Sequence, residues 1–142
     1  MSKTYIPAAL RRLVVKRAQG NCEYCLVPEW LSLTKPYHID HIISEKQLGT
    51  TSEENLALSC RSCNLLKGDS IVARILNTDE YVTLFHPRRD KWHDHFQLLD
   101  SGVLRALTTR AEGTIRLLKL NSINLVNLRL ILLQQGAVPD PE

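Results

Sequence analysis

The sequence predicts an α+β protein with an N-terminal helix, a central strand–loop–strand–helix unit and a C-terminal extension of hairpins and helices. Two Cys-x-x-Cys pairs enclose the central unit, and short runs of alternating or β-prone residues lie between them. Helical periodicity on both sides predicts the flanking helices. We expect residues 1–70 to form the first helix and the central unit, and residues 71–142 to form the extension packed on it.

Length and charge are compatible with a small protein, and we expect it in the cytoplasm. A chain of 142 residues suits one domain with a modest core. Its net charge of +3 permits nucleic-acid binding but does not by itself indicate it. The apolar stretches near the C-terminus are interrupted by Arg129 and are too short for a membrane span, so we expect no membrane association. Nothing in the sequence resembles a secretory signal.

All four cysteines of the chain fall into the two pairs, Cys22 with Cys25 and Cys60 with Cys63. Each Cys-x-x-Cys turn directs both sulfurs at one ion, so two turns complete a tetrahedral site with no open position. We therefore expect a structural Zn²⁺. The alternative is two disulfides or scattered core thiols, which fits less well without a secretory signal.

The residues between the cysteine pairs predict two strands and a helix. Tyr37–Ile43 alternates as a strand, which puts His38 and Asp40 on one face. A polar loop over residues 47–54 leads to a returning strand over residues 55–59. Residues 63–67 then predict a short helix that Gly68 ends.

In order, the segment reads Asp40-His41-Ile-Ile, a loop with Gly49, Asn55-Leu56, and Cys60-x-x-Cys63-Asn64-x-x-Lys67-Gly68. This series resembles the HNH endonucleases, the ββα-metal (His-Me finger) nucleases, in the zinc-clipped branch that carries four cysteines. The resemblance covers about Cys22 to Asp69, and the combination is far more specific than any of its parts. It implies a zinc-stabilised, treble-clef-like ββα-metal core.

The resemblance also implies roles for four residues. Asp40 would bind a catalytic Mg²⁺ or Mn²⁺, and His41 would be the general base. Asn64 would be the second protein ligand of that ion. Asn55 would hydrogen-bond backbone across the turn and hold the His41 loop in place. The implied activity is metal-dependent hydrolysis of DNA to 5′-phosphate and 3′-hydroxyl ends.

The residue chemistry agrees with those roles. Phosphodiester hydrolysis needs a base for the attacking water and a cation for the charge that develops on the phosphate. A carboxylate and an amide oxygen leave most of the Mg²⁺ coordination sphere open, and they suit Mg²⁺ or Mn²⁺ better than a transition metal. We further predict possible phosphate contacts at His38, Arg61 and Lys67. For His38, a packed and non-functional position remains the alternative.

Two positions depart from the family pattern. Ser44 stands where a proline is common, and Leu48-Gly49 stands where two glycines are usual. We expect these changes to alter the loop path and to leave the catalytic groups in place.

The alternative function is a non-catalytic zinc module that binds nucleic acid or protein. Such a module needs the four cysteines but has no use for Asp40, His41 and Asn64 together. A third possibility is a protein that binds a partner and also retains nuclease chemistry.

The flanking helix over Ile6–Ala18 has an apolar face of Leu10, Leu13 and Val14. Its basic residues lie off that face, where both a solvated surface and phosphate contact remain open. They are Arg11, Arg12 and Lys16.

The extension predicts two hairpins, over residues 71–85 and 96–107, followed by two helices capped at Thr109 and Ser122. Between the hairpins, Trp92 lies on a predicted loop, where core packing and DNA-backbone contact are the two interpretations. His93 and His95 are spaced for one strand face but lack the company for a second metal site. The wide apolar face of the last helix suits either the core or a homodimer. As a whole the extension resembles the tail of small stand-alone bacterial HNH proteins.

Overall fold

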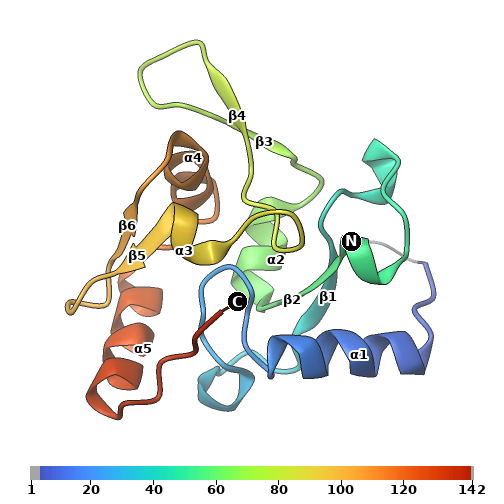
Figure 1. Ribbon diagram of the computed structural model, residues 1–142, viewed down its shortest axis with the longest axis horizontal. Helices are drawn as coiled ribbons and strands as arrows, with labels where there is room; N and C mark the ends of the chain where they lie inside the picture. The colour runs from blue at the N-terminus through green and yellow to red at the C-terminus, as the bar shows by residue number, and fades with distance from the viewer. Residues whose placement is uncertain (1–3, 142) are drawn as a thin grey trace.

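The computed structural model describes residues 4–141, which form an α+β fold with five α-helices and three two-stranded antiparallel sheets (Figure 1). Three short 3₁₀ helices lie in the connections: η1 (Glu29–Leu31), η2 (Glu45–Gln47) and η3 (Glu53–Asn55). No helix among these residues is long and apolar enough to cross a membrane.

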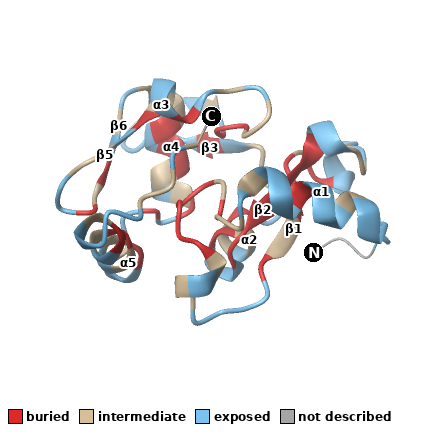
Figure 2. Ribbon diagram, turned by 60° about the horizontal axis from the view of Figure 1, so that its bottom comes forward, coloured by how far each residue is buried: buried red, intermediate tan, exposed pale blue. Residues whose placement is uncertain are grey.

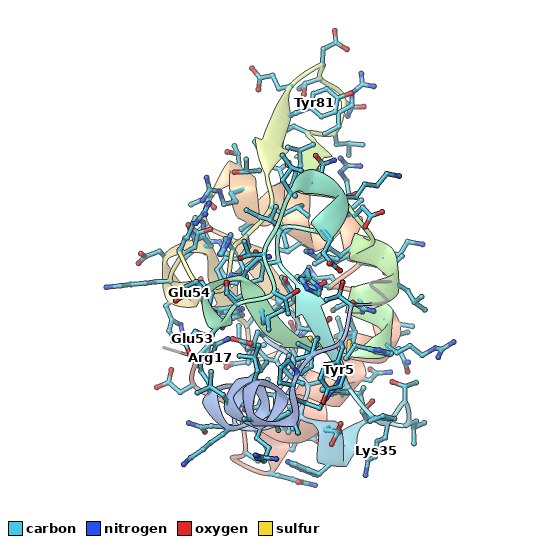
Figure 3. All side chains as sticks on the ribbon, turned by 90° about the vertical axis from the view of Figure 1, so that its right-hand side faces the viewer. Tyr5, Arg17, Lys35, Glu53, Glu54 and Tyr81 are labelled. Atoms are coloured by element: carbon cyan, nitrogen blue, oxygen red, sulfur yellow. The ribbon has the colours of Figure 1, made fainter. Side chains whose placement is uncertain are left out.

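Helix α1 (Ala8–Ala18) begins after Pro7, whose fixed φ suits a helix start, and ends where Gln19 takes a left-handed conformation. Val14 is its one fully buried residue, whereas Leu13 is 40% exposed. The predicted apolar face is therefore narrower than expected, because α1 lies across the surface. Arg17 anchors its end by donating to the carbonyl oxygens of Glu53 and Leu56 at 2.8 and 2.6 Å (Figure 3).

The central unit is the predicted strand–loop–strand–helix. Strand β1 (His38–His41) pairs antiparallel with β2 (Leu56–Ser59), and Asp40 lies opposite Ala57. Helix α2 (Arg61–Lys67) follows at once. It begins two residues earlier than predicted because Cys60 is its N-cap, and the Cys60 sulfur accepts from the Cys63 amide at 3.4 Å.

The extension forms both predicted hairpins. Strand β3 (Val72–Arg74) pairs with β4 (Tyr81–Thr83), and β5 (Phe96–Leu98) pairs with β6 (Leu104–Ala106). The first hairpin projects from the body of the molecule (Figure 1). Helices α4 (Thr109–Leu117) and α5 (Ile123–Gln134) complete the fold.

Two local predictions in the extension are wrong. Residues Trp92–His95 form a short helix, α3, so His93 and His95 do not share a strand face. The cap of α4 is Thr108, whose hydroxyl accepts from the Ala111 amide at 3.1 Å, and not Thr109. The Ser122 cap of α5 is confirmed.

One apolar core joins the two halves of the chain. Val14 and the buried strand β2 belong to the same cluster as Phe85, Trp92 and Phe96 of the extension. Trp92 is 2% exposed and its ring centroid lies 5.1 Å from that of Phe96, which confirms the core interpretation. The buried segments of both halves converge at the centre of the molecule (Figure 2). Residues of the extension and of the central unit thus share one buried cluster.

Arg129, from the middle of α5, is fully buried. Its guanidinium donates to the carbonyl oxygens of Gly102 at 2.8 Å, Cys25 at 3.3 Å and Leu120. The side chain therefore links α5 to the β5–β6 turn and to the first cysteine pair. A charged group is tolerated here because buried carbonyl oxygens accept hydrogen bonds from its N–H groups.

We predict that Arg129→Met lowers the free energy of unfolding by about 3 kcal/mol, because three buried carbonyl oxygens lose a charged donor. Thermal and urea denaturation of the zinc-loaded protein measure this. Arg105→Met is the matched control, since Arg105 is exposed on β6 and its replacement should change stability by less than about 0.5 kcal/mol. Equal effects of the two substitutions would contradict the structural role of Arg129.

Candidate functional site

The four cysteines meet in one buried cluster. Their sulfur atoms all lie within 4.8 Å of one another, and Cys25 Sγ is 3.8 Å from Cys60 Sγ. A disulfide needs sulfurs about 2.05 Å apart, and all four cysteines are free. Zn–S distances of about 2.3 Å in a tetrahedron put neighbouring sulfurs about 3.8 Å apart. The donor set therefore fits a structural zinc ion.

Local backbone geometry directs the first cysteine pair inward. The Leu26 amide donates to the Cys22 carbonyl at 3.0 Å, and Leu26 takes a positive φ of 72° to close the turn. Glu23, between the two cysteines, exchanges hydrogen bonds with Leu58 of β2 through its amide and its carboxylate, at 2.9 and 2.8 Å. The first pair is thus fixed to the strand that leads directly into the second pair.

The electrostatics of the cluster call for a cation. Contacts from the neighbouring thiols, Cys22 first, lower the pKa of Cys60 and raise the pKa values of Cys25 and Cys63. Four thiolates in a buried site would repel one another without a metal ion. Burial lowers the pKa of Arg129, and Cys25 and its neighbours oppose that shift, as expected for a cation beside an anionic cluster.

Asp40 is buried and has two partners. The Tyr24 hydroxyl donates to Asp40 Oδ2 at 2.8 Å, and the Lys67 ammonium lies 3.2 Å from Oδ2 and 3.4 Å from Oδ1. Burial raises the pKa of Asp40, and Lys67 acts in the opposite direction. Burial also raises the pKa of Tyr24, so its hydroxyl stays protonated and able to donate.

Lys67 has a structural position. It is 2% exposed, and its ammonium also donates to the carbonyl oxygen of His41 at 3.0 Å. These contacts fix the end of β1 to the end of α2. The ammonium for which we predicted a phosphate contact is thus buried and paired within the protein. Arg61, by contrast, is exposed at the start of α2.

His41 is the last residue of β1 and is nearly buried. Its Nε2 lies 2.8 Å from the Thr51 hydroxyl and 3.9 Å from a carboxylate oxygen of Glu45. Both partners belong to the β1–β2 connection. The imidazole is thus oriented by the loop that follows its own strand.

Asn55 closes that loop with side-chain hydrogen bonds to backbone. Its Oδ1 accepts from the Ile43 amide at 2.9 Å, and its Nδ2 donates to the carbonyl oxygens of Ile43 and Thr50 at 2.8 Å each. The loop also passes so close to Ile43 that position 49 must be glycine. A Cβ there would lie 1.7 Å from the Ile43 carbonyl oxygen. Backbone hydrogen bonds across the turn are what the family resemblance implies for Asn55.

A pocket of about 460 Å³ opens beside β1 and the start of the loop. Four predicted site residues contribute to its lining, namely His38, Asp40, His41 and Asn64. Asn55, Arg61 and Lys67 lie outside that lining and so do not share the pocket. Sequence reasoning missed Glu45 and Asp69, which also line the pocket. Arg11, for which phosphate contact was left open, reaches it from α1.

Comparison with protein families identifies the segment that carries this pocket. Residues 22–70 match the model of the HNH endonuclease family. Residues 22–70 are an HNH domain. Searches of curated proteins and of solved structures found no match. Every predicted site residue falls within the HNH domain, and the buried cysteine cluster agrees with a zinc-stabilised ββα-metal core.

Parts of the pocket come from outside the HNH domain. Ile6 and Arg11 belong to the N-terminal segment and helix α1, yet both contribute to the lining. The extension also contacts the first cysteine pair, because Arg129 donates to the Cys25 carbonyl. Residues outside the HNH domain therefore supply part of its pocket wall and a hydrogen bond to its first cysteine pair.

We predict that Cys60→Ser loses zinc and unfolds, because a structural metal site of this kind contributes its binding free energy to folding. Zinc content by elemental analysis and circular dichroism measure the two losses. Ser62→Ala is the control, since Ser62 is exposed in the same helix and its sulfur-bearing neighbours are untouched. A folded, zinc-free Cys60→Ser protein would contradict the structural-zinc assignment.

Proposed function

We propose that this protein is a metal-dependent endonuclease that hydrolyses DNA phosphodiester bonds to 5′-phosphate and 3′-hydroxyl ends. The supporting observation is the pocket in the HNH domain, where Asp40, His41 and Asn64 come together from β1 and α2. A module that only binds zinc has no need for a carboxylate, an imidazole and an amide around one pocket.

Asp40 and Asn64 are the proposed ligands of the catalytic ion. A carboxylate and an amide oxygen suit Mg²⁺ or Mn²⁺, and two protein ligands leave room for water and phosphate oxygens. When bound there, the ion would supply positive charge to the phosphate and to the leaving 3′-oxygen. Asn64 directly follows the zinc ligand Cys63, so the structural site fixes its place.

His41 is the proposed general base. The tautomer in which Nε2–H donates to the Thr51 hydroxyl leaves Nδ1 unprotonated, and we assign Nδ1 as the atom that accepts the proton of the attacking water. The water oxygen then bonds to phosphorus as the bond to the 3′-oxygen breaks. Asn55 would act indirectly, because its hydrogen bond to the Thr50 carbonyl holds the loop that carries Thr51.

DNA is the proposed substrate because exposed basic residues flank the pocket. Lys46 and Arg11 line it, and Arg12 and Lys16 continue along the exposed side of α1. Such residues attract a polyanion and make its binding salt-dependent. His38, which lines the pocket, remains a proposed phosphate contact, and we place the protein in the cytoplasm, where thiolates stay reduced.

The direct test is incubation of the zinc-loaded protein with supercoiled plasmid in Mg²⁺, in Mn²⁺ and in EDTA. Metal-dependent nicking, with ends that a ligase can rejoin, is the expected result. Tight binding of DNA without nicking in either metal would support the non-catalytic zinc module instead.

We predict that His41→Ala reduces cleavage by about 100-fold or more, because proton transfer from water loses its acceptor. Initial rates of plasmid nicking measure the effect, and zinc content should stay at the wild-type level. His93→Ala is the control, because His93 is exposed and paired with Asp140 outside the pocket. Nicking by His41→Ala at the rate of His93→Ala would exclude His41 as the base.

A further inference from the structure

Tyr24 lies between the cysteine cluster and the pocket that contains Asp40. It lies inside the first cysteine pair, directly before Cys25, and it is 1% exposed. The side chain extends from the turn that carries Cys22 and Cys25, and its hydroxyl donates to Asp40 Oδ2 at 2.8 Å. One side chain therefore connects the cysteine cluster to the carboxylate of the pocket.

The two partners of Asp40 constrain it differently. Lys67 lies almost equally far from both carboxylate oxygens, at 3.2 and 3.4 Å, so its compact charge neutralises Asp40 without selecting one oxygen. Tyr24 bonds to Oδ2 alone. A directional bond to one oxygen fixes the rotation of the carboxylate and leaves Oδ1 as the oxygen without a hydroxyl partner.

We infer that Tyr24 is a positioning residue of the nuclease site, whose hydroxyl fixes the Asp40 carboxylate so that Oδ1 is presented to the divalent ion. This inference rests on the proposed function, because it takes Asp40 as a metal ligand. Hydrogen bonds from outer groups orient the groups that bind a metal directly, and their loss weakens metal binding. Here the orienting group is carried by the zinc-binding turn itself.

Tyr37 provides a matched comparison in the same region. It is also buried, and its hydroxyl donates to the Val27 carbonyl oxygen, again at 2.8 Å. Both tyrosines thus lose one buried hydrogen bond when replaced by phenylalanine. Tyr37 also lines the pocket, but its hydroxyl bonds to Val27 and only that of Tyr24 bonds to Asp40. A difference between the two variants therefore reports on that carboxylate and not on the loss of a buried hydroxyl near the pocket.

The experiment compares Tyr24→Phe, Tyr37→Phe and the wild type as full-length, zinc-loaded proteins. Mn²⁺ is titrated in and the free ion is followed by electron paramagnetic resonance, which requires no turnover. We expect Tyr24→Phe to bind Mn²⁺ about tenfold more weakly, and Tyr37→Phe to bind it like the wild type. The Mn²⁺ concentration for half-maximal nicking should rise in parallel, while the rate at saturating Mn²⁺ recovers.

Other outcomes separate this inference from the proposed function. Equal Mn²⁺ binding by the two variants would overturn the role of Tyr24 and leave the nuclease assignment intact. Loss of zinc by Tyr24→Phe alone would also overturn it, because the hydroxyl would then serve the structural site. A wild-type protein that neither binds Mn²⁺ nor nicks DNA would overturn the proposed function itself.

Discussion

The structure depends on bringing four buried sulfurs to one point. Cys22 and Cys60 are far apart in the chain, so the cluster joins the end of the N-terminal helix to the start of α2. Four thiolates in a dry interior are tolerable only around a cation, and the arrangement of β2, α2 and the first turn follows from that requirement. The cluster also positions its neighbours in the chain. Tyr24 directly precedes Cys25, Asn64 directly follows Cys63, and strand β2, which pairs with β1, ends directly before Cys60.

The C-terminal extension places a positive charge, that of Arg129, next to the cysteine cluster. A zinc ion with four thiolates carries a net charge of −2, and the guanidinium of Arg129 lies against the Cys25 carbonyl. Because Arg129 also donates to the carbonyl oxygens of Gly102 and Leu120, it links the first cysteine pair to the β5–β6 turn, to the α4–α5 connection and to α5 itself. The extension is thus a component of the zinc site's surroundings, and the shared apolar core reinforces that connection.

The sequence predicted what short-range chemistry determines. Cysteine spacing and strand alternation predicted the cysteine cluster, the ββα unit and both later hairpins, and the family resemblance implied the backbone contacts of Asn55. Tertiary packing lies beyond such local patterns. Lys67, which we expected near phosphate, is buried against Asp40, and Leu13, which we placed on the apolar face of α1, is 40% exposed. Arg129 read as an interruption of an apolar run, since no local pattern reveals which carbonyl oxygens a distant helix will meet. The role inferred for Tyr24 was not predicted from the sequence, where only its position between Cys22 and Cys25 sets it apart.

The buried pair of Lys67 and Asp40 has a consequence for the order in which the protein acquires its ions. Asp40 already has a cationic partner in the chain, so its burial does not require a divalent ion. Beside the cysteine cluster, the single charge of Arg129 cannot balance four thiolates. A structural zinc ion would then be needed as the chain folds, whereas Lys67 already serves Asp40 as a counter-ion. If Asp40 binds a divalent ion as proposed, the folded protein could gain or lose that ion without unfolding.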